Sequence, residues 1–235
     1  MHAASSLDEE DQVRAWRGQT PAAERPAPSG RLIPLCPPED TALPGDSVAQ
    51  VILRRGSARQ FAREPISLAQ LSTMLARGTR GVPADFLEPA GATLNELYLI
   101  VHDVEGLPAG AYVFHRDRQV LELLKEGNFR REAGYLGLEQ ELPADASVNV
   151  YFLADLPRIL GRFGNRGYRA TQLEAGIIGG KLYLSAYAQR LGATGLTFYD
   201  DDVTAFFSPH AAGKSVMFLT ALGRSAKQNA QGGQR

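Results

Sequence analysis

Cysteine is nearly absent from this sequence, and so are the features of secreted or membrane proteins. The single cysteine, Cys36, cannot form an internal disulfide or a cysteine metal cluster, so we expect an intracellular protein without a thiolate zinc site. No apolar run approaches the roughly 20 residues that span a bilayer, and the acidic start MHAASSLDEEDQ lacks the parts of a signal peptide. We therefore expect a cytoplasmic protein with no membrane partner.

An excess of charge of either sign is also lacking. The 25 basic and 26 acidic side chains leave a net charge of −1, and no long block carries one sign. This balance argues against a nucleic-acid partner, which needs a basic footprint. The histidines His102, His115 and His210 stand far apart in the sequence without metal-ligand spacing, so we expect no metal site.

The apolar content is sufficient for one folded domain. With 235 residues and 44% hydrophobic side chains, the chain can bury a sizeable core. Residues 1–44 hold seven of the fourteen prolines and little apolar periodicity, which predicts a Pro-rich N-terminal tail or arm that wraps a surface or stays mobile, with Trp16 and Leu32 as anchors. We expect residues 45–225 to form the domain and residues 226–235 a flexible C-terminal tail.

After residue 45 the sequence predicts both helices and strands. Ser47 or Asp46 and then Ser67 are N-cap candidates, and their helices should end near Gly56 and Gly78. A long helical window covers about residues 167–192. The predicted strands are LYLIVH, the hairpin GAYVFHRDRQVLELL, SVNVYFLAD and KSVMFLTALG. These elements predict an α/β fold around a central sheet.

Three glycines interrupt the long helical window. Gly176, Gly179 and Gly180 each cost about 1 kcal/mol relative to alanine in a helix interior. Their physical use is the close approach of another backbone or of a flat ligand. The helix is therefore either central to the core or part of a dimer interface, and a crowded helical core without any ligand is a further interpretation.

Basic and hydroxyl side chains gather after the first predicted helix, in the run Arg54, Arg55, Gly56, Ser57, Ala58, Arg59. Guanidinium groups offer planar donor pairs that match phosphate oxygens, and a glycine lets the backbone approach closely. The run therefore indicates a phosphate site. The alternative is a solvated basic helix end that interacts favourably with the helix dipole.

Three stretches share the motif order of one known family. The first is ILRRGSARQFAREPISLAQLSTMLARGTRG, with an Arg-x-Ser-x-basic element before a Phe and a helix. The others are EPAGATLNELYLIVHDVEGLPAGAYVFHRDRQVLELL and GYRATQLEAGIIGGKLYLSAYAQRLGATGLTFYDDDVTAFF. Together they resemble the nitroreductase superfamily of FMN flavoproteins over about residues 45–225, closest to the branch of peptide dehydrogenases that oxidise azoline rings.

The resemblance implies an α/β (α+β) nitroreductase-like fold, in which helices flank a central, mostly antiparallel sheet and one long helix is central. It also implies a homodimer that binds FMN. The implied FMN phosphate and ribityl contacts are Arg55, Ser57 and Arg59, with Arg54 as a plausible addition and Arg224 as another basic contact. The implied ring contacts are the loop Pro89, Ala90 and Gly91, which reaches across the dimer, and the backbone of Gly195, Leu196 and Thr197, which donates to the flavin N5 and O4 region.

One departure from the family pattern bears on the reaction. Ring-oxidising members of the branch carry a Lys-Tyr pair that accepts protons, whereas this sequence has Arg162 and Phe163 there. Neither side chain can act as a general base near neutral pH. The catalytic candidates are then Arg162, as a fixed positive charge, and Tyr168 or Tyr199, as substitutes for the missing base. Quinones or nitroaromatics are better test substrates than azoline peptides. The acids Asp200, Asp201 and Asp202 are interpreted as the start of a short helix rather than a metal site.

The sequence thus predicts an FMN-dependent oxidoreductase that transfers a hydride to or from a small organic or peptide-derived substrate. NAD(P)H would be the reductant if the enzyme is a reductase. The alternative from another class is a flavin-free or catalytically idle relative that serves as a binding or scaffold subunit. An apolar-ligand carrier is a weaker third reading, because it gives no reason for the arginine cluster.

Overall fold

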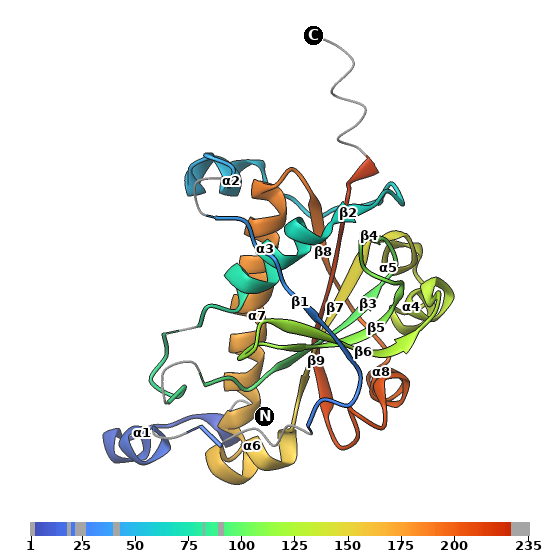
Figure 1. Cartoon of the computed structure of the whole chain (residues 1–235). Helices are drawn as coiled ribbons and strands as arrows, with labels where there is room; N and C mark the ends of the chain where they lie inside the picture. The colour runs from blue at the N-terminus through green and yellow to red at the C-terminus, as the bar shows by residue number, and fades with distance from the viewer. Residues whose placement is uncertain are drawn as a thin grey trace.

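The computed structural model describes residues 3–17, 20–21, 27–39, 43–81, 83–88 and 92–226. A seven-stranded sheet crosses the molecule, with α7 and α3 on one face and α4, α5 and α8 on the other (Figure 1). The helical elements are η1 (Ala3–Ser5), α1 (Glu10–Trp16), α2 (Val48–Arg54), α3 (Leu68–Gly78), α4 (Arg130–Leu136), α5 (Glu141–Asp145), α6 (Leu156–Phe163), α7 (Arg166–Ala188) and α8 (Asp200–Phe207).

The strands of this sheet pair antiparallel throughout. In spatial order they are β1 (Arg31–Pro34), β6 (Val120–Glu126), β5 (Gly110–His115), β3 (Glu96–Val101), β7 (Val148–Ala154), β9 (Ser215–Gly223) and β8 (Gly192–Leu196). A separate short parallel pair joins β2 (Ile66–Ser67) to β4 (Val104–Glu105). The prediction of helices around an antiparallel sheet with one long helix is confirmed.

Sheet burial on both faces explains why the central strands carry continuous apolar runs. Leu97, Leu99 and Val101 of β3 belong to the core under α3 and α7, whereas Tyr98 and Ile100 belong to the core under α4 and α8. Side chains alternate between the two faces of a strand, so a strand covered on both sides must be apolar at every position. The two layers therefore account for the pattern of LYLIV.

Both predicted helix starts are confirmed by their caps. The Ser47 hydroxyl accepts the amide of Gln50, whose side chain accepts the amide of Ser47, and Ser67 and Gln70 repeat this reciprocal pair. Such a pair satisfies two backbone donors that the first helical turn leaves open. The cap fixes where α2 begins, and the arginine run follows its last turn.

The glycines of α7 divide between core and surface. A Cβ on Gly179 would lie 2.6 Å from Cε1 of Phe218, so this glycine lets β9 pack closely against the helix. A Cβ on Gly176 or Gly180 would meet nothing within 4 Å. The interpretation of close packing in the core therefore holds for Gly179, and a dimer interface at Gly176 and Gly180 stays a prediction.

The described part of residues 1–44 packs against the domain. Arg31–Pro34 form β1, the edge strand beside β6, although their apolar periodicity is too weak to predict a strand. Trp16 at the end of α1 packs between Phe86 and Phe163, with ring centroids 5.6 and 5.5 Å apart, which fits its predicted role as an anchor. Within the described ranges, no helix is long and apolar enough to cross a bilayer.

Candidate functional site

The segment that follows α2 lies along the open edge of β8 and the end of β9. The Ala58 amide donates to the carbonyl of Ala193 at 2.9 Å, and the Ala62 amide donates to the carbonyl of Arg224 at 2.9 Å. A bridge between Phe61 and Ser225 continues the pairing. These contacts bring the arginine run to Arg224 and to the start of β8. Residues 195–197, predicted as a loop, begin within β8, and Tyr183 links them to the run because it contacts both Arg55 and the Gly195 amide.

The side chains of the arginine run are open to solvent at this edge. Ser57 and Arg59 have no hydrogen-bond or ion-pair partner among the described residues. Arg55 lies with its Cζ 5.8 Å from the ring centroid of Tyr183 on α7. Cation–π contact holds a guanidinium by one face and leaves its N–H groups in the ring plane for a ligand. The run therefore offers uncommitted donors.

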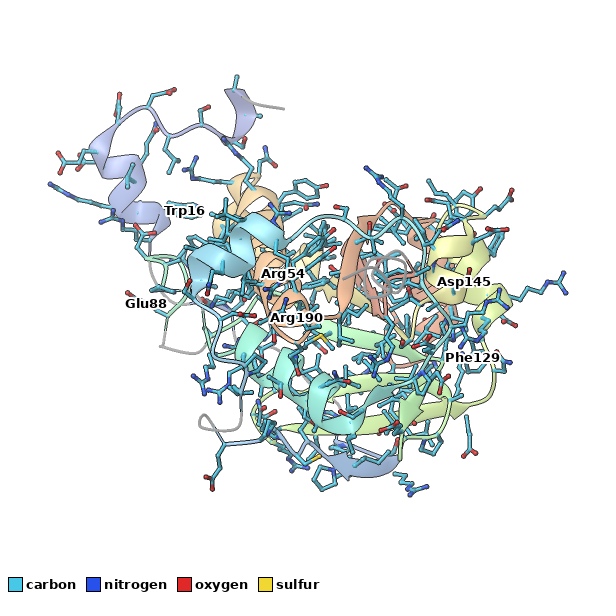
Figure 2. The ribbon with its side chains drawn as sticks, turned by 90° about the horizontal axis from the view of Figure 1, so that it is seen from above. Trp16, Arg54, Glu88, Phe129, Asp145 and Arg190 are labelled. Atoms are coloured by element: carbon cyan, nitrogen blue, oxygen red, sulfur yellow. The ribbon has the colours of Figure 1, made fainter. Side chains whose placement is uncertain are left out.

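Arg54 differs from its neighbours, because the fold already uses its guanidinium. It donates to Asp46 Oδ2 at 2.9 Å and to the carbonyl of Tyr187 at 2.9 Å, near the end of α7. Arg190 binds the same carboxylate oxygen at 3.0 Å, and Figure 2 shows the two arginines side by side. This arrangement fastens α2 to α7, so we omit Arg54 from the proposed ligand contacts.

Arg224 is close to the run but partly engaged. Its Nε donates to the carbonyl of Pro65 at 3.1 Å and lies 3.6 Å from Glu64 Oε2. Both side chains of this ion pair are about half exposed, at 45% and 48%. Exposed ion pairs contribute little stability, so a ligand phosphate can compete for Arg224 at small cost.

The backbone of β8 determines which amides face this edge. Ala193 accepts from Ala58 there, and the Gly195 amide donates to the hydroxyl of Tyr183. Backbone groups of an edge strand alternate between the partner strand and the open side. Thr197 follows the last residue of β8, is exposed, and its amide has no acceptor in the described part of the chain. Leu196 pairs opposite Leu219 of β9.

The predicted loop contacts Pro89, Ala90 and Gly91 lie outside the described residues. Their flanks are held from two sides. On one side Thr20 donates from its hydroxyl to the carbonyl of Phe86 at 2.9 Å and accepts the Glu88 amide at 3.1 Å. On the other side Glu174 of α7 accepts the amides of Leu94 and Asn95 at 2.8 and 2.9 Å.

Glu174 and Tyr183 are structural residues that the sequence analysis missed. Burial raises the pKa of the Glu174 carboxyl, opposed by hydrogen bonds from Asn95, Leu94 and Thr93 that favour the charged form. An acidic residue on the inner face of a glycine-rich helix is the signal that could have indicated Glu174, because buried carboxylates need partners. Nothing in the sequence spacing indicates that Tyr183 meets Gly195.

The three catalytic candidates do not converge. Arg162 donates to the carbonyl of Arg17 at 2.9 Å and lies over the ring of Phe163, so it holds the N-terminal arm. Tyr168 accepts a hydrogen bond from Gln172 near the start of α7. Tyr199 precedes α8, with its ring 5.2 Å from that of Tyr135. Only Tyr199 lies close in sequence to the open edge of β8.

The described residues of the site offer donors suited to an anion and to the edge of a flat polar group. Guanidinium and hydroxyl donors lie at one end, and a backbone amide lies at the strand edge. Fixed donors of this kind stabilise negative charge on a bound group without reorganisation.

Comparison with known proteins identifies a family for most of the chain. The sequence model of the Nitroreductase family matches residues 52–223, which begins within α2 and ends at the last residue of β9. The arm before α2 lies outside this match.

Three similar proteins can be named. A Methanocaldococcus jannaschii protein named as a candidate nitroreductase is 29% identical over 163 residues, covering 65% of this chain and 80% of that protein. The crystal structure of a candidate nitroreductase from Anabaena variabilis superposes with a TM-score of 0.72 and 28% identity, and the aligned region covers 83% of this chain but 42% of that one. A chain of the Escherichia coli microcin synthetase McbBCD complex with truncated pro-MccB17 bound superposes with a TM-score of 0.61 and 16% identity. The aligned region covers 76% of this chain and 73% of that one.

Proposed function

The chain belongs to the nitroreductase family, and we propose that it is an FMN-dependent oxidoreductase that transfers a hydride to or from a small organic or peptide-derived substrate. The observation that supports the proposal is that the hydrogen bond between Ala58 and Ala193 holds residues 55–59 against β8, where Arg55 and the Gly195 amide both contact Tyr183. Family membership supports an oxidoreductase, and the donor set supports the cofactor.

The residues present fit the phosphate end of FMN. Ser57 and Arg59 lack partners among the described residues, and Arg55 keeps its N–H groups available beside Tyr183. Arg224 adds a fourth donor once it gives up Glu64. Charged donors bind phosphate oxygens more strongly than neutral ones do, which supports phosphate anchoring by Arg55, Ser57 and Arg224.

The same edge fits the polar rim of the isoalloxazine ring. When bound, FMN supplies the two-electron redox chemistry. The Thr197 amide would donate to the N5 and O4 region, and Arg59 would place a positive charge near the pyrimidine side of the ring. Both groups stabilise the electron-rich reduced ring, because a fixed donor and a cation favour negative charge beside them.

The surroundings favour reduction over azoline oxidation. Arg162 cannot accept a proton and is engaged with the arm, and Phe163 is buried and has no titratable group. Azoline oxidation requires proton removal from carbon, for which the candidates are Tyr168 and Tyr199. Quinones and nitroaromatics, with NAD(P)H stacked in the same pocket as hydride donor, are therefore the substrates to test first.

A homodimer is part of the proposal. Apolar side chains are exposed on both α2 and α7, with Leu53 at 87% and Leu173 at 54% exposure. Gly176 and Gly180 leave the α7 face between them flat. Exposed apolar surface of this kind marks an interface, and a two-fold contact would bring the loop at Pro89–Gly91 toward a partner's flavin.

The alternative is a flavin-free relative that acts as a scaffold subunit. The absorption spectrum of the purified full-length chain separates the two. We expect yellow protein with flavin bands, or colourless protein that binds added FMN stoichiometrically and is reduced by NAD(P)H in the presence of a quinone. Protein that ignores added FMN at micromolar concentration would contradict the proposal and favour the scaffold.

A further inference from the structure

The N-terminal arm supplies the hydrogen bonds that hold residues 83–88 of the domain. Thr20 donates from its amide to the Glu88 carbonyl at 2.9 Å, and its hydroxyl accepts the Glu88 amide at 3.1 Å. The same hydroxyl donates to the Phe86 carbonyl at 2.9 Å. In the described part of the chain, these are the only hydrogen bonds that join the backbone of residues 83–88 to another segment.

Residues 83–88 otherwise depend on side-chain packing. They belong to no helix or strand, and Phe86 and Leu87 are buried in the core under α3 and α7. Thr20 is itself buried. A buried backbone group that loses its partner costs free energy, so the amide and hydroxyl of Thr20 determine where the backbone of this segment lies.

Trp16 connects the same segment to the junction of α6 and α7. Its ring packs against Phe86 and Phe163, and its indole N–H donates to the Phe163 carbonyl at 3.2 Å. The guanidinium of Arg166, the first residue of α7, lies 5.1 Å from the centroid of the Trp16 ring. Figure 2 shows Trp16 and Glu88 at the same side of the molecule. The arm is therefore held both by residues 83–88 and by the helix junction.

Arg17 adds one contact to each side. Its Nε lies 2.7 Å from Asp85 Oδ2, and its carbonyl accepts from Arg162 at 2.9 Å. Both side chains of the ion pair are 54% exposed, and exposed pairs contribute little stability. The contacts of Trp16 and of the buried Thr20 therefore account for most of the attachment.

We propose that the arm is a strap, formed by Trp16, Arg17 and Thr20, that sets the position of residues 83–88 beside the flavin. This inference rests on the proposed function, in which the loop that begins at Pro89 reaches a partner's flavin. Trp16 and Thr20 are then positioning residues, because they act on the cofactor through residues 83–88. A site binds its ligand more weakly when only a fraction of the molecules is in the competent arrangement, so a loosened strap lowers the affinity for FMN. The arm precedes the family match, which makes the strap a property of this chain.

Hydrogen exchange of the full-length protein tests the strap without flavin. Thr20→Val removes the hydroxyl and nearly keeps the side-chain shape, whereas Thr20→Ser keeps the hydroxyl. We expect the amides of residues 84–88 to exchange about fivefold faster in the valine variant, the equivalent of one neutral hydrogen bond, and at the wild-type rate in the serine variant. Thr73→Val is the matched control, because Thr73 is also buried but donates to Ala69 within α3. Equal exchange in Thr20→Val and Thr20→Ser would overturn the proposal.

The affinity for FMN tests the consequence of the strap. Thr20→Val should bind FMN about fivefold more weakly than wild type, and Thr20→Ser and Thr73→Val should bind it like wild type. A second pair of variants covers the case in which Thr20→Val does not fold. Trp16→Ala should give the same two changes, and Trp16→Phe, which keeps a ring between Phe86 and Phe163, should restore most of the affinity.

The two measurements separate this inference from the proposed function. Faster exchange in Thr20→Val of a chain that binds no FMN would contradict the flavin proposal and support the strap. A chain that binds FMN, with exchange and affinity unchanged in Thr20→Val and Trp16→Ala, would do the reverse. Faster exchange with unchanged affinity for FMN would show that the arm does not act on the cofactor, and would overturn the inference.

Discussion

The backbone amide of Gly195 donates to the hydroxyl of Tyr183, which ties the open edge of β8 to α7. This contact removes Gly195 from the amides that could serve a ligand. Leu196 pairs with Leu219 of β9, and the amide of Thr197, the residue after β8, has no acceptor among the described residues, so we propose Thr197 as the donor to the ligand. The relationship therefore selects one residue from the predicted run of three.

Thr197→Pro removes that amide, and Thr197→Ala keeps it. We expect the proline variant to bind FMN about 1 kcal/mol more weakly, the usual net value of a neutral hydrogen bond, and the alanine variant to bind like wild type. Proline costs little here, because the amide has no protein acceptor in the described structure. Fluorescence titration of apoprotein with FMN measures the difference. Equal affinities would remove Thr197 from the ring contacts.

Arg55→Ala should weaken FMN binding by about 1.5–3 kcal/mol, the range for hydrogen bonds to charged groups. The same titration applies. Arg118→Ala is the control, because Arg118 is also exposed but lies in the turn between β5 and β6. If both variants bind FMN like wild type, the phosphate assignment fails.

Arg59→Ala should make the two-electron reduction potential of bound FMN more negative. Loss of a cation near the pyrimidine edge destabilises the anionic reduced ring, and each 1.4 kcal/mol corresponds to about 30 mV for two electrons. Dye-coupled reductive titration gives the potential. An unchanged potential with intact binding would place Arg59 away from the ring.

Gly180→Arg should convert a dimer into a folded monomer. The position has open space, so the side chain fits on one subunit but obstructs a second copy at the flat face of α7. Light scattering measures the mass, and Glu132→Arg on the exposed face of α4 is the control. A Gly180→Arg protein that stays dimeric would show that the dimer interface lies elsewhere. A wild-type monomer that holds FMN would contradict the homodimer itself.

His102 should make the protein sensitive to acid. Burial, together with the nearby Arg130 charge, lowers the pKa of its imidazole to about 4, and its Nε2 lies 3.1 Å from the Pro143 carbonyl. The unfolded state binds a proton below about pH 6.5 while the folded state stays neutral, so stability falls as pH drops from 6.5 toward 4.

The size of this effect can be measured by urea unfolding. Between pH 7 and pH 5 the loss attributable to His102 is about 2 kcal/mol. His102→Gln should remove most of it, whatever the stability of the variant at pH 7. A variant with the same slope against pH as wild type would show that another group titrates.

The amino-acid sequence by itself determined the helices α2, α3, α7 and α8 and the strands β3, β5, β6, β7 and β9, but not β1, α4, α5, α6 or β8. Reciprocal caps at Ser47 and Ser67 are local, and so is the apolar run of β3, which is why helix starts and buried strands could be predicted. The arginine run was predicted as a donor cluster from its composition alone. Local chemistry and periodicity suffice for such features, because the interacting groups are neighbours in the chain.

Tertiary structure decided which of those residues are free to act. Arg54 and Arg55 are adjacent and identical in type, yet Asp46 and Tyr187 occupy one while the other faces solvent beside Tyr183. Gly179 and Gly180 differ in the same way, since one meets Phe218 and the other meets nothing. β1 pairs with β6, about 90 residues away, and Ser5 accepts from Arg166, about 160 residues away. Pairings between such distant segments leave no period or motif in the sequence, so only the packed fold assigns them.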